Sequence, residues 1–154
     1  MHDAHIPDLL PGLHGAILDI VGLINGPQRD EMLIGEAGVQ LEQVHFPLLV
    51  LIGRFGPIGV VDLADRVGRD YTTVSRQLAK MENLGLIVRQ ADAIDRRIRH
   101  AMLAPAGKWM TDRIDAARER VLMRGFRDWT ADDVATLARL MRRLADTMAE
   151  RPAP

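Results

Sequence analysis

Apolar residues recur at helical spacing near the start of the chain. Within residues 7–25 they form a stripe at Leu10, Leu13, Ile17, Ile20, Val21 and Ile24. This spacing predicts a helix with one broad apolar face. Because only Asp19 is ionic between Leu9 and Ile24, the face needs more cover than one neighbouring helix supplies. We expect a dimer interface to provide that cover, with burial inside the monomer as the alternative.

Two further segments lead to the centre of the chain. Residues 25–38 are rich in turn formers and predict a connector with one short helical turn. Residues 40–56 predict a second helix, with Pro47 in its first turn, where the missing N–H costs no hydrogen bond. The Gly56-Pro57 pair ends that helix.

The central third of the chain predicts two short helices joined by a tight turn. The first covers residues 59–68, and Gly59 is an acceptable N-cap. Its inward-facing residues are Leu63, Ala64 and Val67. Gly68 and Arg69 form the turn. The Asp70 carboxylate is then placed to cap the second helix by accepting from free N–H groups.

The second helix covers residues 71–84 and has one apolar and one polar face. Its apolar residues are Val74, Leu78 and Met81. At 100° per residue, an arc of about 140° contains the polar residues Thr72, Thr73, Arg76, Gln77 and Lys80. Gly85 follows in the left-handed position beyond the helix end, which places Leu86 against Met81 as in a Schellman motif.

A β-hairpin follows the second helix. Residues 86–90 and 98–103 predict its strands, and Asp92 and Asp95 favour a turn between them. A helix, a turn, a second helix and a hairpin in this order predict a winged helix-turn-helix. That arrangement indicates duplex DNA as the partner and argues against an enzyme.

Two groups of side chains are the candidate DNA contacts. The polar face of the second helix carries hydroxyl, amide and guanidinium groups, which bond phosphates and base edges; a solvated helix face is the alternative. On the hairpin, Arg96, Arg97 and Arg99 crowd together where no apolar pattern requires them. A narrow minor groove attracts an inserted arginine, and Asp95 can hold Arg97 extended by a charge-assisted hydrogen bond. A merely soluble hairpin tip is the alternative there.

Charge is distributed unevenly along the chain. The total is −1 and the pI about 6.5, which alone argues against a nucleic-acid partner. Residues 1–53 carry one basic residue against seven acidic ones, residues 54–100 nine against six, and residues 101–154 ten against eight. The overall value therefore hides a positive balance where the second helix and the hairpin lie.

Composition excludes several classes of protein. The 154 residues correspond to about one domain with a core of its own. With no cysteine, the chain has no disulfide framework, thiolate zinc site or cysteine redox sensor. No apolar run reaches the ~20 residues that span a bilayer, and no basic region precedes an apolar core at the N-terminus. We therefore expect a cytoplasmic protein with no signal peptide and no membrane partner.

No sequence motif indicates catalysis. The chain lacks a phosphate-binding loop, a nucleophile elbow and a dinucleotide-binding glycine motif. Its five histidines show no metal-ligand spacing; His2 and His5, three positions apart, are at most a weak hint of a metal site. We expect no enzyme activity, no metal and no cofactor.

The last third of the chain predicts two more helices. After Gly107, apolar residues recur at helical spacing at Met110, Ile114, Ala117 and Val121. Thr130 and Asp133 form a capping box that opens the last helix. Its apolar residues are Val134, Leu137, Leu140, Met141, Leu144 and Met148. Both helices are compatible with a dimer interface.

The chain resembles the MarR family of bacterial transcriptional regulators. The matching pieces are residues 60–90 and the wing residues Asp95, Arg96 and Arg97, followed by Leu103 and Gly107. The resemblance implies a homodimer in which the terminal helices dimerise and each protomer presents one wing. It implies that Arg97 is the wing arginine and Asp95 its brace. It also implies a recognition helix whose positions match Tyr71, Thr72, Thr73, Ser75, Arg76, Gln77 and Lys80.

The resemblance has two departures and leaves one site open. Ala104 stands where the family usually has a helix-capping threonine, and Pro105 partly compensates by fixing φ. Peroxide sensing by a reactive cysteine cannot operate in a chain without cysteine. The family often binds small aromatic or phenolic effectors, and His14, His45 and Trp109 are candidates to line such a pocket. Structural histidines and a core or interface tryptophan are the alternative.

Together these observations predict a mainly α fold with a small β-hairpin wing. The expected organisation is an N-terminal dimerisation helix and connector (residues 1–34), a winged helix-turn-helix (35–104) and C-terminal dimerisation helices (105–154). The expected function is that of a homodimeric regulator that binds a pseudo-palindromic duplex operator as a ligand-responsive repressor. The alternative is a winged-helix protein-interaction module that does not bind DNA.

Overall fold

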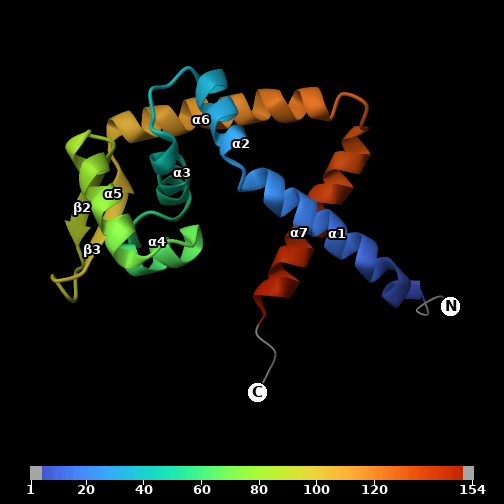
Figure 1. The fold of residues 1–154 in the computed structure, drawn as a ribbon, viewed down its shortest axis with the longest axis horizontal. Coiled ribbons are helices and arrows are strands. Elements are labelled where there is room, and N and C mark those ends of the chain that lie inside the picture. Colours follow the sequence, from blue (N-terminus) through green and yellow to red (C-terminus); the bar gives the residue numbers. More distant parts are fainter. Residues whose placement is uncertain (1–4, 151–154) are drawn as a thin grey trace. The chain divides into compact units, whose positions relative to one another are not determined.

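The structure, a computed structural model, describes residues 5–150, which are mainly helical with one small antiparallel sheet (Figure 1). This confirms the predicted fold class. The chain divides into two compact units, residues 1–117 and 118–154. The elements are α1 (Ile6–Ile24), α2 (Pro27–Ala37), η2 (Gln43–His45), α3 (Phe46–Phe55), β1 (Ile58–Gly59), α4 (Val60–Val67), α5 (Tyr71–Asn83), β2 (Ile87–Ala91), β3 (Arg99–Leu103), α6 (Pro105–Gly125) and α7 (Ala131–Ala149).

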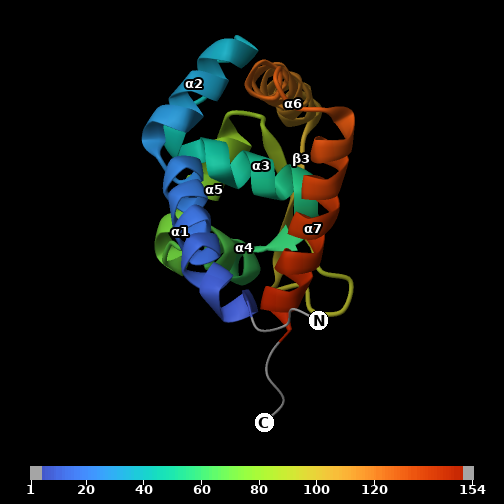
Figure 2. The ribbon, with the colours of Figure 1, turned by 90° about the vertical axis from the view of Figure 1, so that its right-hand side faces the viewer.

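A winged helix-turn-helix forms the centre of the first unit. α3 packs against α4 and β3, while α5 packs against α4 and β2 (Figures 1 and 2). The sheet has the order β1-β3-β2, and both pairings are antiparallel. Sequence patterning did not predict β1, because two residues are too short to alternate. It pairs Ile58 with Ala101 and Gly59 with His100, so it joins the wing to the start of α4.

The two helices of the motif begin and end where the sequence predicts, within one residue. Gly59 is the N-cap of α4, and the Asp70 carboxylate accepts the Thr73 N–H at 2.9 Å at the start of α5. Beyond α5, Gly85 has φ of 75°, a conformation that glycine adopts without steric cost. The Leu86 N–H then donates to the Met81 carbonyl at 3.0 Å, which completes the Schellman motif.

The core of this unit is built mainly from α3, α4, α5, α6 and the wing, and α2 adds Leu33 and Ala37. Its most deeply buried side chains include Leu48, Leu49 and Ile52 of α3, Leu63 of α4, Val74, Leu78 and Met81 of α5, Ile87 of β2 and Ile114 of α6. The predicted inward residue Val67 is half-buried. Because the apolar face of α5 is wholly buried, its polar face is held outward in a fixed orientation.

The segment predicted to be a connector is a helix of eleven residues, α2. That prediction is wrong because its punctuating residues lie at the helix ends rather than inside it. Pro27 occupies the first turn, where no N–H is needed, and Gly38 closes the helix in the left-handed conformation. Leu33 and Ala37 are buried, so tertiary packing supports the helix.

α1 forms as predicted and contributes no buried residue. Its exposed large apolar side chains range from 41% exposed for Ile20 to 70% for Leu23. By length and composition alone the helix could cross a membrane, contrary to our expectation that no apolar run is long enough. Buried helices of soluble proteins pass the same test, and Asp8 and Asp19 interrupt this run.

α6 starts at Pro105, directly after Ala104, despite the missing threonine cap. The Ala104 N–H donates to the Leu86 carbonyl at 3.0 Å. Two residues later the helix passes so close to the same carbonyl that a Cβ at Gly107 would lie 2.1 Å from its oxygen. Glycine is required there because the backbone of α6 touches the segment that follows α5.

The second unit contains the end of α6 and α7. The predicted capping box is present: the Thr130 hydroxyl accepts the Asp133 N–H at 3.1 Å, and the Asp133 carboxylate accepts the Thr130 N–H at 3.2 Å. Just before it, the rings of Phe126 and Trp129 meet edge to face, 5.0 Å apart. Among the described residues of α7 none is buried. Its exposed apolar side chains include Leu140, Met141 and Met148.

Candidate nucleic-acid interface

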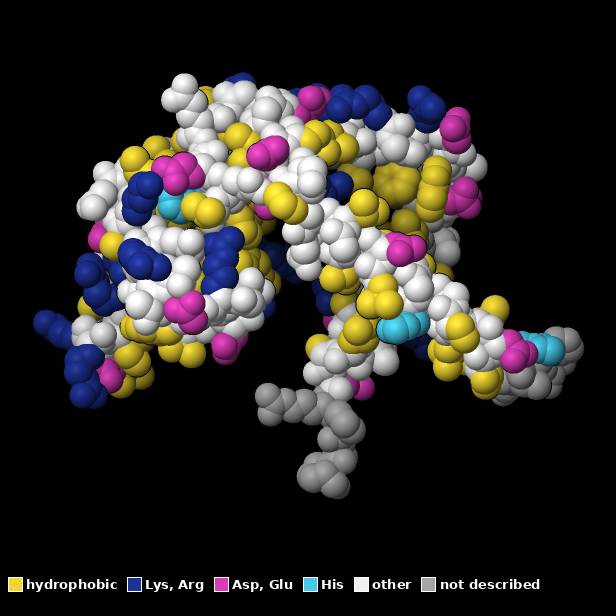
Figure 3. Space-filling model, in the orientation of Figure 1, with side chains coloured by type: hydrophobic (Ala, Val, Ile, Leu, Met, Phe, Trp, Pro, Cys, Tyr) yellow, Lys and Arg dark blue, Asp and Glu magenta, His cyan; other side chains and the backbone are white. Residues whose placement is uncertain are grey.

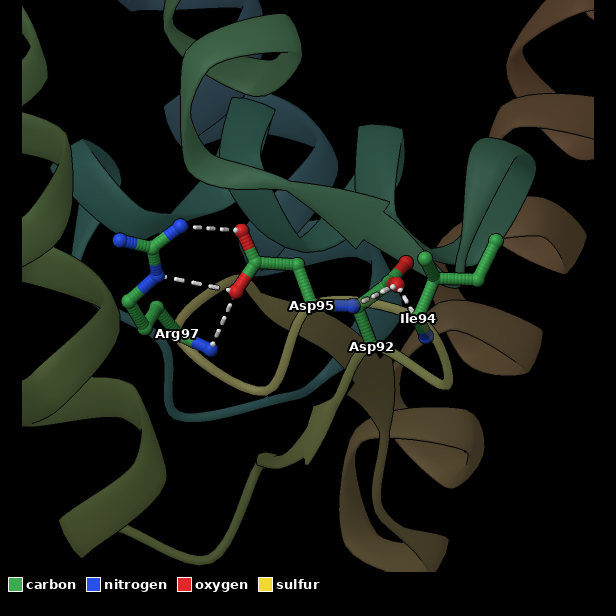
Figure 4. A network of polar contacts seen from close by, with 4 residues as sticks. All are labelled: Asp92, Ile94, Asp95 and Arg97. Carbon is green, nitrogen blue, oxygen red and sulfur yellow. Dashed lines mark hydrogen bonds and ion pairs between the residues drawn. The ribbon is translucent and has the colours of Figure 1, made fainter.

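The tip of the wing is organised by two aspartates, as the sequence predicted (Figure 4). One Asp92 oxygen accepts the N–H groups of Ile94 and Asp95 at 2.8 and 3.0 Å. The Asp95 carboxylate in turn accepts the Arg97 N–H at 3.1 Å, and its two oxygens receive Nε and Nη2 of the Arg97 guanidinium, each at 3.1 Å. These bonds lower the pKa of Asp95 and raise that of Arg97.

The brace leaves Arg97 almost entirely in solvent. Its side chain is 92% exposed, against 36% for Asp95. A bidentate pair restricts the rotamers of a long side chain, so the guanidinium is held in one direction while its remaining N–H groups stay free for another acceptor. Arg96 and Arg99 are exposed beside it.

A histidine that no sequence signal distinguished lies in β3, next to the tip of the wing. His100 Nε2 lies 2.9 Å from the second oxygen of Asp92. The pKa of Asp92 is lowered to about 2. The largest cause is the hydrogen bond from His100, followed by those from the N–H groups of Asp95 and Ile94. Asp92 therefore connects β3 to the tip through a single carboxylate.

The polar face of α5 divides into free and engaged side chains. Tyr71, Thr72 and Arg76 are exposed, while Ser75 is half-buried. The Thr73 hydroxyl donates to Asp70 at 2.7 Å, so it supports the helix cap. The hydrogen bonds that Asp70 accepts from the Thr73 hydroxyl and from the Thr73 N–H lower the pKa of the Asp70 carboxyl.

The remaining two candidates on α5 have partners outside the helix. Lys80 Nζ lies 2.9 Å from a carboxylate oxygen of Glu42, just before η2. Arg69 Nη1 donates to Gln77 Oε1 at 2.9 Å and to the Val44 carbonyl at 2.8 Å. Periodicity could not find these contacts, since their partners lie far along the chain or in the inter-helix turn.

A hollow lies between the wing and the start of both helices of the motif. Its volume is about 710 Å³, and it brings together Tyr71, Arg97 and Arg99 from the predicted site residues. Arg89 of β2 and His100 join them there, although no sequence signal distinguished these two. Figure 3 shows Lys and Arg side chains (dark blue) gathered at the wing, lower left, and on the helices beside it.

The three residues proposed for an effector pocket lie on separate elements. His14 is exposed on α1, and Trp109 is half-exposed on α6 beneath the Arg113 guanidinium, 4.9 Å from the ring centroid. His45 is 1% exposed, and burial lowers its pKa. No hydrogen bond, ion pair or ring contact joins any two of the three among residues 5–150.

No cluster that could hold a metal occurs in the described part of the chain, where groups of three or more His, Cys, Asp and Glu side chains are absent. His2, from the weak histidine pair, lies outside the described residues.

Comparison with known proteins agrees with this geometry. Residues 41–98 match the model of the MarR family. The uncharacterized HTH-type transcriptional regulator YxaD of Bacillus subtilis is 28% identical over 104 residues, which cover 68% of this chain and 73% of that protein. The crystal structure of MarR superposes with a TM-score of 0.60 at 25% identity, covering 96% of this chain and 93% of that one.

A third similar protein was solved with DNA. It is a MarR family transcriptional regulator from Listeria monocytogenes complexed with 26mer DNA, at 18% identity and a TM-score of 0.65, covering 89% of this chain and 97% of that one. The match covers the helix-turn-helix and most of the wing, and the structural likeness extends over nearly the whole chain. Residues 41–98 are therefore similar to the MarR family, and the chain has the winged helix-turn-helix fold of that family's transcriptional regulators.

Proposed function

We propose that this protein is a sequence-specific regulator of transcription that binds duplex DNA as a homodimer. The observation that carries the proposal is the braced but solvent-exposed Arg97 on the wing, which lines the same hollow as Tyr71 at the start of α5. The wing and α5 are held by the same core, so a cation and a row of hydrogen-bonding groups are presented together before any ligand binds.

The proposed binding mode assigns different tasks to the two elements. α5 enters the major groove, where Thr72 and Arg76 reach base edges and phosphates. The wing lies over the adjacent minor groove, whose negative potential attracts Arg97. Arg96 and Arg99 bind phosphate, which positions the protein without reading sequence.

A dimer is supported by the exposed apolar faces of α1 and α7. Monomeric proteins rarely expose so many large apolar side chains along one helix, and a two-fold dimer buries the same face of both copies. Two recognition helices related by such an axis would read half-sites about 10 base pairs apart. The operator is then a pseudo-palindrome.

The dimer has a direct test. Leu13→Glu on α1 places a charge in the proposed interface, and we expect it to convert dimer to monomer in light scattering. Asp19→Ala on the same helix is the matched control and should leave the dimer intact. A wild-type protein that is monomeric at micromolar concentration would contradict this part of the proposal.

Regulation is proposed to occur through repression relieved by a small aromatic or phenolic effector, in the cytoplasm. A ligand changes DNA affinity only by binding the DNA-competent and incompetent conformations unequally. His14, His45 and Trp109 remain the candidates to contact it.

Selection of bound sequences from a random duplex pool tests the proposal as a whole. We expect enrichment of a two-fold symmetric site with half-sites about one helical turn apart. A protein-interaction module would enrich no duplex at any salt concentration, and that result would contradict DNA binding.

A further inference from the structure

Arg69 lies at the junction between the inter-helix turn, η2 and α5. A single terminal nitrogen, Nη1, donates to the Val44 carbonyl at 2.8 Å and to Gln77 Oε1 at 2.9 Å. Both hydrogens of that nitrogen are therefore used. The contact ties a side chain on the polar face of α5 to a residue outside the helix.

The chemistry of this contact decides which way the Gln77 amide faces. A guanidinium carries donors only, whereas an amide has a donor end and an acceptor end. The carbonyl oxygen must face Arg69, since a flipped amide would place its NH₂ group against another donor. Gln77 Nε2 consequently points away from Arg69.

The amide nitrogen of Gln77 is free to donate a hydrogen bond to a ligand. Among the described residues Nε2 of Gln77 has no hydrogen-bond partner, and it is not one of the buried polar atoms that lack one. The nitrogen is therefore not fully buried, although the Gln77 side chain as a whole is half-buried. Gln77 follows Arg76 directly and lies one turn after Thr73 on the polar face.

We propose that Arg69 is a positioning residue that holds Gln77 as a hydrogen-bond donor toward a base edge in the major groove, an inference that rests on the proposed DNA-binding function. Guanine, adenine and thymine present acceptors there, whereas cytosine presents only its N4 amino donor. Gln77 then discriminates against cytosine at one position of each half-site. An unrestrained glutamine could present either its donor or its acceptor end, so it would not discriminate against cytosine.

Selection from a random duplex pool, run on wild type and variants side by side, tests this assignment. The wild type should disfavour cytosine at one position of each half-site by about five- to tenfold, as expected for one hydrogen bond. Gln77→Glu keeps an acceptor for Arg69 but presents a second acceptor outward. It should therefore prefer cytosine at that position.

Arg69→Met removes the restraint and should relax the preference at that position alone. Thermal unfolding checks that this variant folds without the bond to Val44, and Gln77→Glu provides a second test that keeps the bond. Arg66→Met, which removes an arginine paired with Asp62 on α4, is the matched control and should leave every base preference unchanged.

The outcomes distinguish failure of the role proposed for Arg69 from failure of DNA binding itself. Failure of the wild type to enrich any duplex would contradict DNA binding itself. Enrichment with the same base preferences in wild type, Gln77→Glu and Arg69→Met would overturn the role of Arg69. A uniform loss of affinity in Gln77→Glu, with no changed position, would equally overturn it, because that result describes a phosphate contact.

Discussion

His100 Nε2 and Asp92 Oδ2 lie 2.9 Å apart where the strands of the wing meet its tip, and the other oxygen of the same carboxylate accepts two backbone N–H groups of the tip. An ionised carboxylate only accepts hydrogen bonds, so the Nε2 nitrogen carries the proton. The tip that presents Arg97 thus depends on a histidine in β3, at the opposite end of the hairpin strand from the core.

This relationship predicts how the wing responds to acid. The pKa of Asp92 is lowered from 3.8 to about 2, so its contribution to wing order is complete above pH 4 and is lost as the pH falls through about 2. His100→Ala removes the largest cause of the shift and should move the loss to a higher pH. The amide NMR signals of Ile94 and Asp95, followed against pH, report the loss of their hydrogen bonds to Asp92. Identical pH midpoints in the wild type and His100→Ala would contradict this role of His100.

Replacement of the wing arginine should affect binding and not folding. Arg97 is exposed, and its hydrogen bonds among residues 5–150 are with Asp95, so Arg97→Ala should leave the thermal unfolding midpoint unchanged. In a dimer it removes two phosphate-attracting cations, which should reduce the slope of log K against log salt by about 1.8. Fluorescence anisotropy with a labelled duplex measures this slope.

A control variant separates charge from orientation at the same site. Asp95→Asn keeps the Arg97 charge but weakens its brace, so it should lower affinity less than Arg97→Ala and leave the salt slope nearly unchanged. A variant Arg97→Ala that unfolds at a clearly lower temperature would instead assign this arginine a structural role.

The ion pair of Glu42 with Lys80 should compete with DNA. Lys80 Nζ is engaged by the carboxylate at 2.9 Å, and the hydrogen bond from Lys80 lowers the pKa of Glu42. Glu42→Gln frees the lysine for phosphate, so affinity should rise severalfold at low salt. Glu31→Gln removes the same charge from α2 and serves as the control; an equal gain in both would show only a change in net charge.

The close approach at Gly107 should make this residue intolerant of any side chain. A Cβ there would lie 2.1 Å from the Leu86 carbonyl oxygen, so Gly107→Ala should destabilise the protein by at least about 2 kcal/mol. Gly35→Ala, with open space around the added methyl, should stabilise α2 by up to ~1 kcal/mol. Chemical denaturation measures both, and a neutral Gly107→Ala would show that α6 can move away.

The motif was predictable because its signals are local. Asp70, Gly85 and the period of Val74, Leu78 and Met81 act within one or two turns, and a helix needs no distant partner to display them. The brace of Arg97 by Asp95 is likewise a contact between residues two apart. Each of these predictions is confirmed by the structure.

The remaining features were hidden because they depend on tertiary contacts. α2 was missed since its helical state rests on burial of Leu33 and Ala37 rather than on an apolar stripe. The partners of Gln77 and Lys80 come from the turn and from residues before α3. Overall charge was misleading for a related reason, as it averages an acidic N-terminal third with a basic centre.

The most direct test of the central claim is the salt dependence of binding to a duplex that carries the selected site. We predict that log K falls linearly with log salt, with a slope near −0.9 for each phosphate neutralised, and that a random duplex binds at least about a thousandfold more weakly at the same salt. Absence of binding to every duplex at low salt would contradict it.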